Sequence, residues 1–240
     1  MSEVFVKHGS APGAAAAEAA YLRWLREGSN AVVEVIDVDE DANTLTIERV
    51  ESARPTVEAA RAAGRELAAI HAMGADAFGA PAHGWDGPNF IGTRRQECTP
   101  TRRWAPFYVE QRVLPFAEHA VKAGNLGGGG FDAVKQACDA LVEEDEDAPL
   151  ARIHGDLWAG NLLFSPDGPR FIDPAAHGGH PLTDIAMLEL FGAPHLSAIV
   201  DGYLDAGGSL GRDWQRRIAV HQLHPLAVHA WTHGPSYGSA

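Results

Sequence analysis

The chain of 240 residues has a formal net charge of −13, and 45% of its side chains are hydrophobic. This length can bury a sizeable core, as one large domain or as two lobes. The acidic balance argues against nucleic acid or an anionic membrane as the main partner, because phosphate groups select basic surfaces.

No basic-then-apolar signal sequence opens the chain, and no apolar run approaches the roughly 18 residues of a membrane span. The two cysteines, Cys98 and Cys138, provide no disulfide framework, and neither has the spacing of a zinc site. We therefore expect a cytoplasmic protein.

The first two predicted elements each carry one charged residue of interest. Val4-Phe5-Val6-Lys7 favours a strand that ends in a lysine, and residues 14–27 favour a helix with Glu18 near its start. Taken alone, both side chains have an ordinary interpretation. Lys7 is typical of a solvated strand end, and Glu18 of a surface carboxylate favoured by the helix dipole.

The middle of the chain predicts a hairpin followed mainly by helices. Residues 32–38 and 44–50 are β-branched runs joined by a turn-rich segment, which is typical of a hairpin. Pro55 opens a helix that runs to Met73, and His71 near its end is interpreted as a packing or capping residue. We further expect a loop over 74–101, followed by a helical aromatic stripe from Trp104 to Leu114 that Pro115 breaks or kinks. After it we expect a flexible connector at 127–130, a helix over 131–142 and a solvated acidic run at 143–147.

Residues 153–174 are the most informative stretch. Asp156 and Asn161 are five residues apart between apolar triplets typical of short strands, and Asp173 ends another apolar triplet twelve residues later. Phosphoryl transfer from a nucleotide needs a carboxylate to accept the proton of the attacking hydroxyl and oxygen ligands for magnesium. Kinase catalytic loops place their base and their metal-binding Asn at this spacing. The whole constellation predicts a phosphoryl-transfer site.

This site gives the two N-terminal charges a second interpretation. In kinases, a strand lysine contacts the nucleotide phosphates and a helix glutamate holds that lysine, in the order seen for Lys7 and Glu18. Downstream we expect helices over 182–191, 196–206 and 212–231, the last interrupted at Pro225. Asp184 lies at the start of the first of these helices, where a cap is the ordinary interpretation.

The twelve histidines suggest a metal site, and His229 and His233 have i, i+4 spacing. The sequence, however, has no His-Glu-x-x-His motif, so a transition-metal site is disfavoured. A Ser-His-Asp hydrolase is disfavoured too, because there is no Gly-x-Ser-x-Gly elbow.

His154-Gly155-Asp156-Leu157-Trp158-Ala159-Gly160-Asn161 resembles the catalytic signature of the fructosamine kinase (ketosamine-3-kinase) family. That family belongs to the aminoglycoside-phosphotransferase-like branch of the protein-kinase-like fold. Relatives acting on aminoglycosides or choline usually lack Trp158. Residues 172–187 resemble the family's metal loop and following helix, and residues 229–237 resemble its closing His-x4-Gly-x-Ser-Tyr element. Residues 88–92 resemble its Asn-x-Ile-Gly element, with Pro88 where an Asp is usual.

The resemblance implies ATP and Mg²⁺ as cofactors and a role for each motif residue. Asp156 would be the catalytic base, Asn161 and Asp173 would hold magnesium, and Lys7, fixed by Glu18, would bridge the phosphates. The strand at 45–50 would enter the hinge between lobes, where Ile47, Glu48, Arg49 and Val50 would bind the nucleotide, a plain edge strand being the alternative. Trp158 and His229 would contact the substrate, while His154 and Asp184 would support the catalytic loop. Trp158 has a core-aromatic alternative.

The implied fold is α+β and bilobal, with a nucleotide-binding lobe over residues 1–50 and a helical lobe over 51–240. Family members carry two strands and a glycine-bearing turn before the lysine strand. Here only Met1-Ser2-Glu3 precede it, so we expect either a start assigned downstream of the true one or a reduced lobe.

The leading hypothesis is an ATP-dependent kinase for a sugar hydroxyl of a ketoamine, either a small sugar-amine or a glycated protein side chain. A kinase for an aminoglycoside, an amino alcohol or another sugar would use the same residues. A nucleotide-binding pseudokinase is the alternative from a different class.

Overall fold

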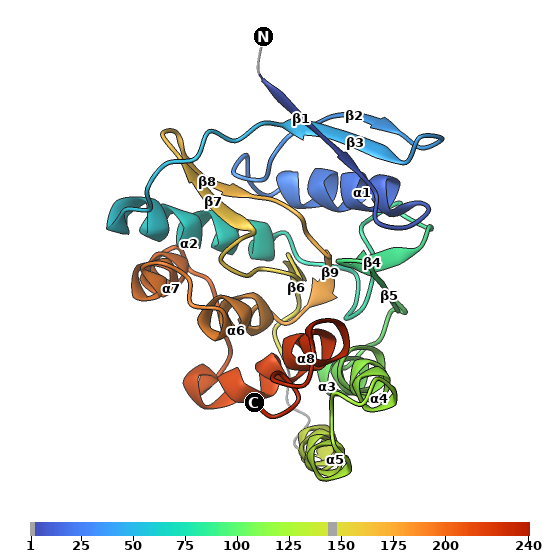
Figure 1. The fold of residues 1–240 in the computed structure, drawn as a ribbon. Coiled ribbons are helices and arrows are strands. Elements are labelled where there is room, and N and C mark those ends of the chain that lie inside the picture. The colour runs from blue at the N-terminus through green and yellow to red at the C-terminus, as the bar shows by residue number, and fades with distance from the viewer. Residues whose placement is uncertain (1–2, 144–147) are drawn as a thin grey trace.

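The computed structural model describes residues 3–143 and 148–240. Its N-terminal part is a three-stranded antiparallel sheet of β1 (Val4–His8), β3 (Thr44–Glu48) and β2 (Val35–Asp39), in that order, next to helix α1 (Ala14–Arg26) (Figure 1). The predicted strand, helix and hairpin are confirmed. Val32 and Val33, expected in the hairpin, instead pair with Phe171 and are fully buried.

The remaining chain is mainly helical. Its helices are α2 (Val57–Ala72), α3 (Trp104–Phe107), α4 (Leu114–Lys122), α5 (Gly128–Glu143), α6 (Leu182–Leu190), α7 (Leu196–Asp205) and α8 (Trp214–His233). Its strands form three two-stranded ladders, β4 (Asn89–Ile91) with β5 (Arg94–Gln96), β6 (Ala151–Ile153) with β9 (His177–Gly179), and β7 (Leu162–Ser165) with β8 (Gly168–Phe171). The α+β expectation is therefore confirmed.

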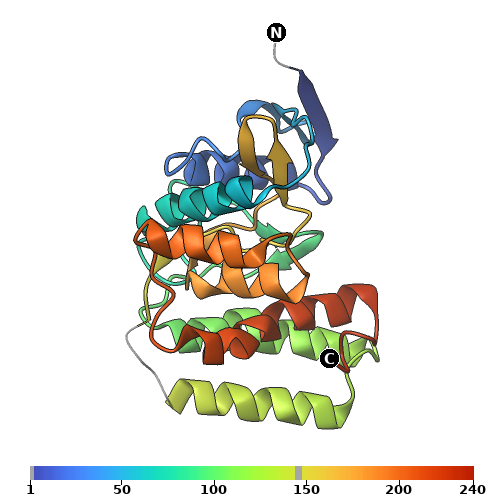
Figure 2. The ribbon, with the colours of Figure 1, turned by 90° about the vertical axis from the view of Figure 1, so that its left-hand side faces the viewer.

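The helices lie in layers below the sheet, with α2 over α7, α7 near α6, and α8 beside α4 (Figure 2). Helices α2 and α7 approach closely because each presents a glycine at the crossing. A Cβ on Gly64 would collide with the backbone of Ile199, and one on Gly202 with that of Arg61. None of the helices described here is long and apolar enough to cross a membrane.

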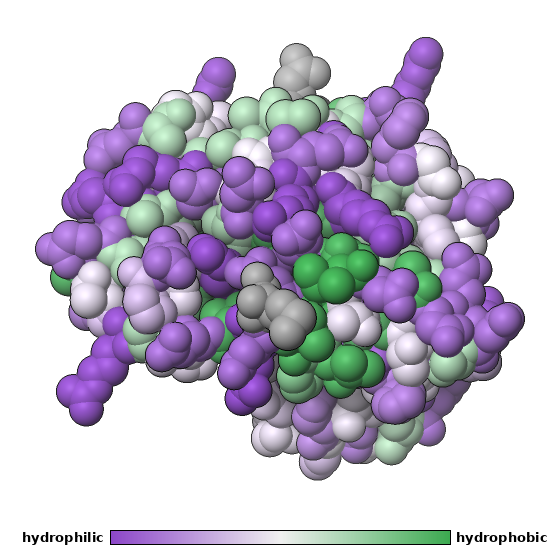
Figure 3. Space-filling view, turned by 90° about the horizontal axis from the view of Figure 1, so that it is seen from above, coloured by the Kyte–Doolittle hydropathy of each residue, from purple (hydrophilic) through white to green (hydrophobic). Residues whose placement is uncertain are grey.

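Strand β1 lies at an edge of its sheet, and Val4, Phe5 and Val6 are each about half exposed. Seen from above, hydrophobic residues gather in a patch near the centre of a largely hydrophilic face (Figure 3). The proposed lobe boundary near residue 50 stays a prediction. Backbone pairing of Val33 with Phe171 joins the two parts across it.

Two of the loop predictions are wrong. Residues 74–101 contain the β4–β5 hairpin. Gly128, Gly129 and Gly130 form the first turn of α5 instead of a flexible connector. Phe131 packs against the core cluster that includes Phe116 and Leu126, and this contact fixes the start of the helix. Of the predicted acidic run, all but Glu143 lies outside the described residues.

The predicted interruption at Pro225 is wrong. The helix does not end at Pro115 either, and the predicted kink there stays a prediction. Before Pro115 the helix widens into a π-helix over Tyr108–Val113, which accommodates a ring that cannot donate a hydrogen bond. Helix α8 continues through Pro225. There the Tyr108 hydroxyl accepts from the His224 N–H at 3.2 Å and donates to the Val220 carbonyl at 2.9 Å. The hydroxyl thus bridges a donor and an acceptor that an unbroken helix would join directly.

Candidate active site

The loop that carries Asp156 is built on the β6–β9 ladder. After β6 the chain turns at Gly155, whose φ of 78° and contact with the Ala175 carbonyl leave no room for a side chain. The Ala175 N–H donates to the His154 carbonyl at 2.9 Å. This bond joins the segment before Asp156 to the segment after Asp173.

The β7–β8 hairpin places Asn161 and Asp173 together, because each lies just outside one end of the ladder. The Asn161 amide donates to the backbone carbonyl of Asp156 at 2.8 Å and to that of Asp173 at 3.3 Å. These bonds hold the amide nitrogen and leave the Asn161 Oδ1 oxygen as an acceptor. Asp173 itself has a φ of 55°, a left-handed conformation that is uncommon for a residue other than glycine.

Lys7 comes to the same place from the N-terminal sheet. Its Nζ lies 2.7 Å from a carboxylate oxygen of Glu18 and 2.6 Å from one of Asp173. Burial opposes the charge of Lys7, but the two carboxylates outweigh it and raise the pKa of the amine. Burial raises the pKa of Glu18 to about 7, against the opposing effect of Lys7.

The carboxyl group of Asp156 has a strongly shifted pKa. Burial first, and then the charges of Asp173 and Asp184, raise it to about 8. Its side chain also lies 3.5 Å from the Asn161 amide, a contact that lowers the pKa and only partly offsets the shift. A base with a pKa near neutrality is suited to taking a proton from a hydroxyl group.

Two adjoining cavities meet at Asp156 and Trp158. One, of about 360 Å³, is lined by Lys7, Glu18, Asn161 and Asp173. The other, of about 530 Å³, is lined by an aromatic and imidazole wall that includes Phe191, His229 and Tyr237. The structure therefore brings the candidate catalytic and phosphate-side residues to one cavity and the candidate substrate residues to the next.

The family of the chain follows from its sequence. The model of the family described as "Fructosamine kinase" matches residues 1–240. The chain belongs to the fructosamine kinase family. The protein "Probable ketoamine kinase YniA" of Escherichia coli (strain K12) is 30% identical over 213 residues, which cover 88% of this chain and 72% of that protein.

Solved structures agree with the membership in the fructosamine kinase family. A candidate fructosamine-3-kinase from Thermobifida fusca YX-ER1 is 40% identical, with a TM-score of 0.91 over 99% of this chain and 82% of that chain. The choline kinase LicA from Streptococcus pneumoniae is 16% identical, with a TM-score of 0.59 over 99% of this chain and 82% of that chain. The second similarity shows a shared fold alone.

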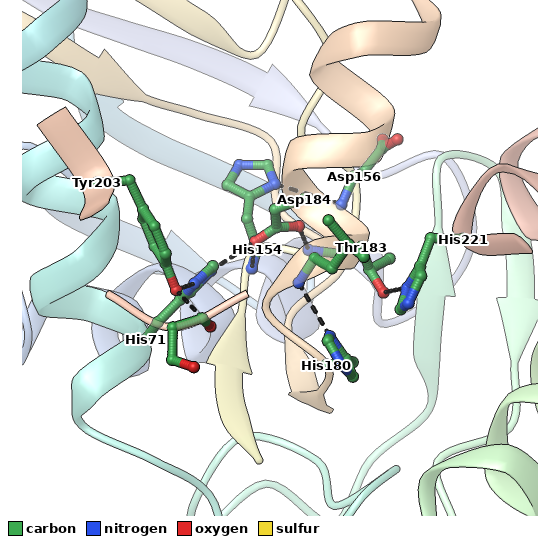
Figure 4. Close-up of polar contacts among 11 residues, drawn as sticks. His71, His154, Asp156, His180, Thr183, Asp184, Tyr203 and His221 are labelled. Carbon is green, nitrogen blue, oxygen red and sulfur yellow. Dashed lines mark hydrogen bonds and ion pairs between the residues drawn. The ribbon is translucent and has the colours of Figure 1, made fainter. Parts of the chain in front are cut away.

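In this fructosamine kinase family member, Asp184 holds the loop that carries Asp156, and His71 and Tyr203 extend this contact into a network that the sequence did not reveal. Its carboxylate accepts from the N–H groups of His154 at 2.8 Å and Gly155 at 2.9 Å. His71 contacts the same carboxylate at 3.0 Å and the Tyr203 hydroxyl at 2.9 Å (Figure 4). From the sequence, His71 was interpreted only as a packing or capping residue, and Tyr203 carried no signal because 132 residues separate the two.

His154 supports the loop from the other side. One of its ring nitrogens contacts the Ile172 carbonyl at 2.9 Å, and the other accepts from the Asp156 N–H at 3.3 Å. Burial lowers the pKa of His154 against the effect of Asp184. The imidazole therefore joins the base loop to the segment before Asp173.

Trp158 is 43% exposed and lines both cavities. The alternative interpretation of this residue as a core aromatic is wrong. Its ring meets Phe191 edge-on at 6.5 Å between centroids. Gly160 lies directly under the ring, where a Cβ would collide with it.

The predicted hinge lies apart from the two cavities. Ile47 is buried in the sheet, and Glu48 forms an ion pair with Arg170 at 3.2 Å. The N–H of Glu48 donates to the Glu34 carbonyl, and that of Arg49 donates to the Glu3 carbonyl. A nucleotide base would therefore have to use the N–H of Val50 or the carbonyl groups of this segment, and the role of these residues stays a prediction.

A hard cation fits the oxygen donors of Asn161 and Asp173. Among residues 3–143 and 148–240, no group of three or more His, Cys, Asp or Glu side chains is arranged to hold a metal ion. The Asn161 Oδ1 and the Asp173 carboxylate offer oxygen donors only. That donor set suits Mg²⁺, which is usually held by one or two protein ligands together with substrate phosphates.

Proposed function

We propose that this protein transfers the γ-phosphoryl group of ATP to a hydroxyl group on the sugar of a ketoamine, in the cytoplasm. The observation that carries the proposal is the convergence of Lys7, Asn161 and Asp173 on one cavity, with the base Asp156 at the boundary to an aromatic cavity. Membership of the fructosamine kinase family supports the acceptor class.

In the proposed step, the acceptor oxygen attacks the γ-phosphorus while the bond from that phosphorus to the β–γ bridging oxygen breaks, and ADP leaves with the electron pair. The proton of the hydroxyl group moves to a carboxylate oxygen of Asp156. Because burial and two neighbouring carboxylates raise its pKa to about 8, Asp156 binds this proton readily.

Lys7 would contact the phosphates of the nucleotide, with Glu18 keeping its ammonium group in place. Asn161 and Asp173 would hold magnesium, whose charge offsets the negative charge that builds up on the phosphates. The related LicA has been solved in complex with AMP, which supports a nucleotide as the donor's class.

Trp158 and His229 would line the acceptor subsite. An exposed indole next to Asp156 offers an apolar wall for the ring or chain of a sugar. Burial lowers the pKa of His229, whose Nδ1 contacts the Pro225 carbonyl at 2.8 Å. A neutral imidazole that donates its Nδ1–H to this carbonyl leaves Nε2 free to accept a hydrogen bond from a hydroxyl group of the acceptor.

The proposal is tested by coupled ADP release with Mg-ATP and a ketoamine such as fructoselysine, set against an aminoglycoside and choline as acceptors. Turnover should require the ketoamine, and Asp156→Asn should abolish it with the fold intact by circular dichroism. Asp167→Asn is the matched control, because Asp167 is exposed in the turn between β7 and β8. Full activity in Asp156→Asn would refute the mechanism, and turnover of the other acceptors alone would refute the substrate class.

A further inference from the structure

The acceptor cavity contains a cation that phosphoryl transfer as proposed above does not use. Of the residues lining this cavity of about 530 Å³, Arg94 is the single Arg or Lys, and Asp156 is the single carboxylic acid. Arg94 is the first residue of β5 and follows the turn at Gly92, where φ is 53°. The β4–β5 hairpin thus brings a guanidinium group to the wall of the cavity.

Arg94 has no carboxylate partner within the described part of the chain. Two other arginines shielded from solvent do, since Arg152 pairs with Glu27 at 2.8 Å and Arg170 pairs with Glu48 at 3.2 Å, whereas the buried Arg112 donates to backbone carbonyls instead. The Nε of Arg94 is buried and makes no hydrogen bond to any described residue. In a protein of net charge −13, a guanidinium without a counter-ion at a cavity wall is a site suited to an anion from outside the protein.

The guanidinium is also held in one orientation. Its Cζ lies 4.3 Å from the centroid of the Trp231 ring, a cation–π contact. Trp231 is in turn stacked on His119 at 4.2 Å with an interplanar angle of 12°. A planar fork fixed in this way is preorganised for two parallel hydrogen bonds to a carboxylate.

Arg94 belongs to the acceptor side of the site. Gly92, Thr93 and Asp156 line both cavities, but Arg94 lines only the one that contains His229 and Tyr237. The phosphate-side cavity has its own cation in Lys7. An anion bound by Arg94 is therefore part of the acceptor and is distinct from the phosphates of the donor.

We propose that Arg94 binds a carboxylate carried by the acceptor, so that the preferred substrates are ketoamines formed from free amino acids, in which a carboxylate stays close to the amine. This inference rests on the proposed function and specifies its substrate class. It predicts that removing the charge from the amino-acid part of the substrate weakens turnover even though the sugar is unchanged.

The test compares two ketoamine acceptors that differ in one group. Fructosylglycine carries a carboxylate, and fructosylglycinamide carries a neutral amide in its place. Wild-type kcat/KM should be roughly 10- to 100-fold higher for the carboxylate, the range expected for a charge-assisted pair. Arg94→Gln should remove that preference and leave the amide acceptor within about two-fold of wild type, a difference worth less than about 0.5 kcal/mol. Arg94→Lys should restore part of the preference. Arg95→Gln is the matched control, since Arg95 is exposed and lies outside this cavity.

Each other outcome is decisive. Equal kcat/KM for both acceptors in the wild type overturns the inference and leaves the ketoamine kinase standing. If Arg94→Gln lowers kcat/KM equally for both acceptors, Arg94 acts on the phosphoryl group and not on a carboxylate of the acceptor. This result also overturns the inference. If neither acceptor supports ADP release, the proposed function is refuted, and so is the inference that rests on it. If Arg94→Gln does not fold, the wild-type comparison and Arg94→Lys still decide.

Discussion

His71 and Asp184 form a buried pair in which the imidazole lies 3.0 Å from the carboxylate that holds the loop carrying Asp156. Three donors, His71 and the N–H groups of His154 and Gly155, converge on this carboxylate. Burial opposes its charge, but the hydrogen bond and charge of His71 prevail and lower the pKa of Asp184. The loop position thus depends on a charge that these donors stabilise.

We predict that His71→Leu lowers kcat and reduces the free energy of unfolding by about 1–3 kcal/mol, because a buried carboxylate loses one of its donors. The reduction should appear in urea unfolding, with kcat measured on the same preparation. His83→Leu is the matched control, since His83 is exposed in a loop, and its effect should stay within about 0.5 kcal/mol. If stability falls while kcat stays unchanged, the contact between His71 and Asp184 does not set the position of the loop that carries Asp156.

The pKa of Asp156 predicts the pH dependence of turnover. In the proposed mechanism the carboxylate form of Asp156 is the base, and its pKa of about 8 means that this form predominates only above that pH. The kcat/KM for the acceptor should therefore rise with pH through neutrality and level off above about 8. A flat profile between pH 6 and pH 9 would contradict this assignment.

Asp156 also predicts a pH-dependent change in stability. Its pKa is raised on folding, so its contribution is favourable at low pH and is lost as pH rises through about 8. Asp156→Asn removes this penalty. Its melting temperature should exceed that of the wild type by more at pH 9 than at pH 6, as differential scanning calorimetry can measure. A constant difference would show that the surroundings of Asp156 do not raise its pKa on folding.

Four of the buried histidines predict sensitivity to acid. Burial lowers the pKa of His180 to about 3 and holds those of His177, His221 and His224 well below the usual range. Since these pKa values fall on folding, the stability they contribute is present above about pH 6.5 and is lost below it, by up to about 1.4 kcal/mol per pH unit for each group.

Urea unfolding at pH 7.5 and pH 5.5 should reveal this loss. His224→Phe should make the dependence on pH shallower, because it removes one of the four groups together with an Nε2 that has no partner among the described residues. His83→Gln should leave the dependence unchanged. Equal stability at the two pH values would contradict the burial of these rings.

Tyr108→Phe should destabilise the protein by about 1–3 kcal/mol, because the His224 N–H and the Val220 carbonyl lose the hydroxyl that bridges them. Pro225→Ala in the same chain should recover part of that loss. Without the proline ring, the helix can close and let the two groups bond directly. Additive effects of the two changes in thermal melts would show that the hydroxyl and the proline act independently.

Local patterns predicted the parts of the site that are close in sequence. The spacing of Asp156, Asn161 and Asp173 needs only two short strands to bring the side chains together, and residues 151–173 contain them. The order of a strand lysine and a helix glutamate likewise gave the pairing of Lys7 with Glu18. Residues whose contacts cross the fold were not predictable in this way.

Arg94 and Tyr108 show why contacts across the fold could not be predicted from the sequence. Arg94 matters because of Trp231, and Tyr108 because of a helix more than a hundred residues away. The predicted interruption at Pro225 was wrong for the same reason, since a single sequence shows that a proline lacks a donor but not which distant hydroxyl compensates for it.

The contact of Lys7 with Asp173 at 2.6 Å has a thermodynamic consequence. Each group neutralises the other, and each has a different partner in the proposed reaction, phosphate for Lys7 and magnesium for Asp173. Substrate binding then exchanges counter-ions twice. Phosphate takes Lys7 from Asp173 and so frees the Asp173 carboxylate for magnesium, and magnesium takes Asp173 from Lys7 and so frees the ammonium group for phosphate. By reciprocity each strengthens the binding of the other, so the site favours the metal–nucleotide complex over either component alone.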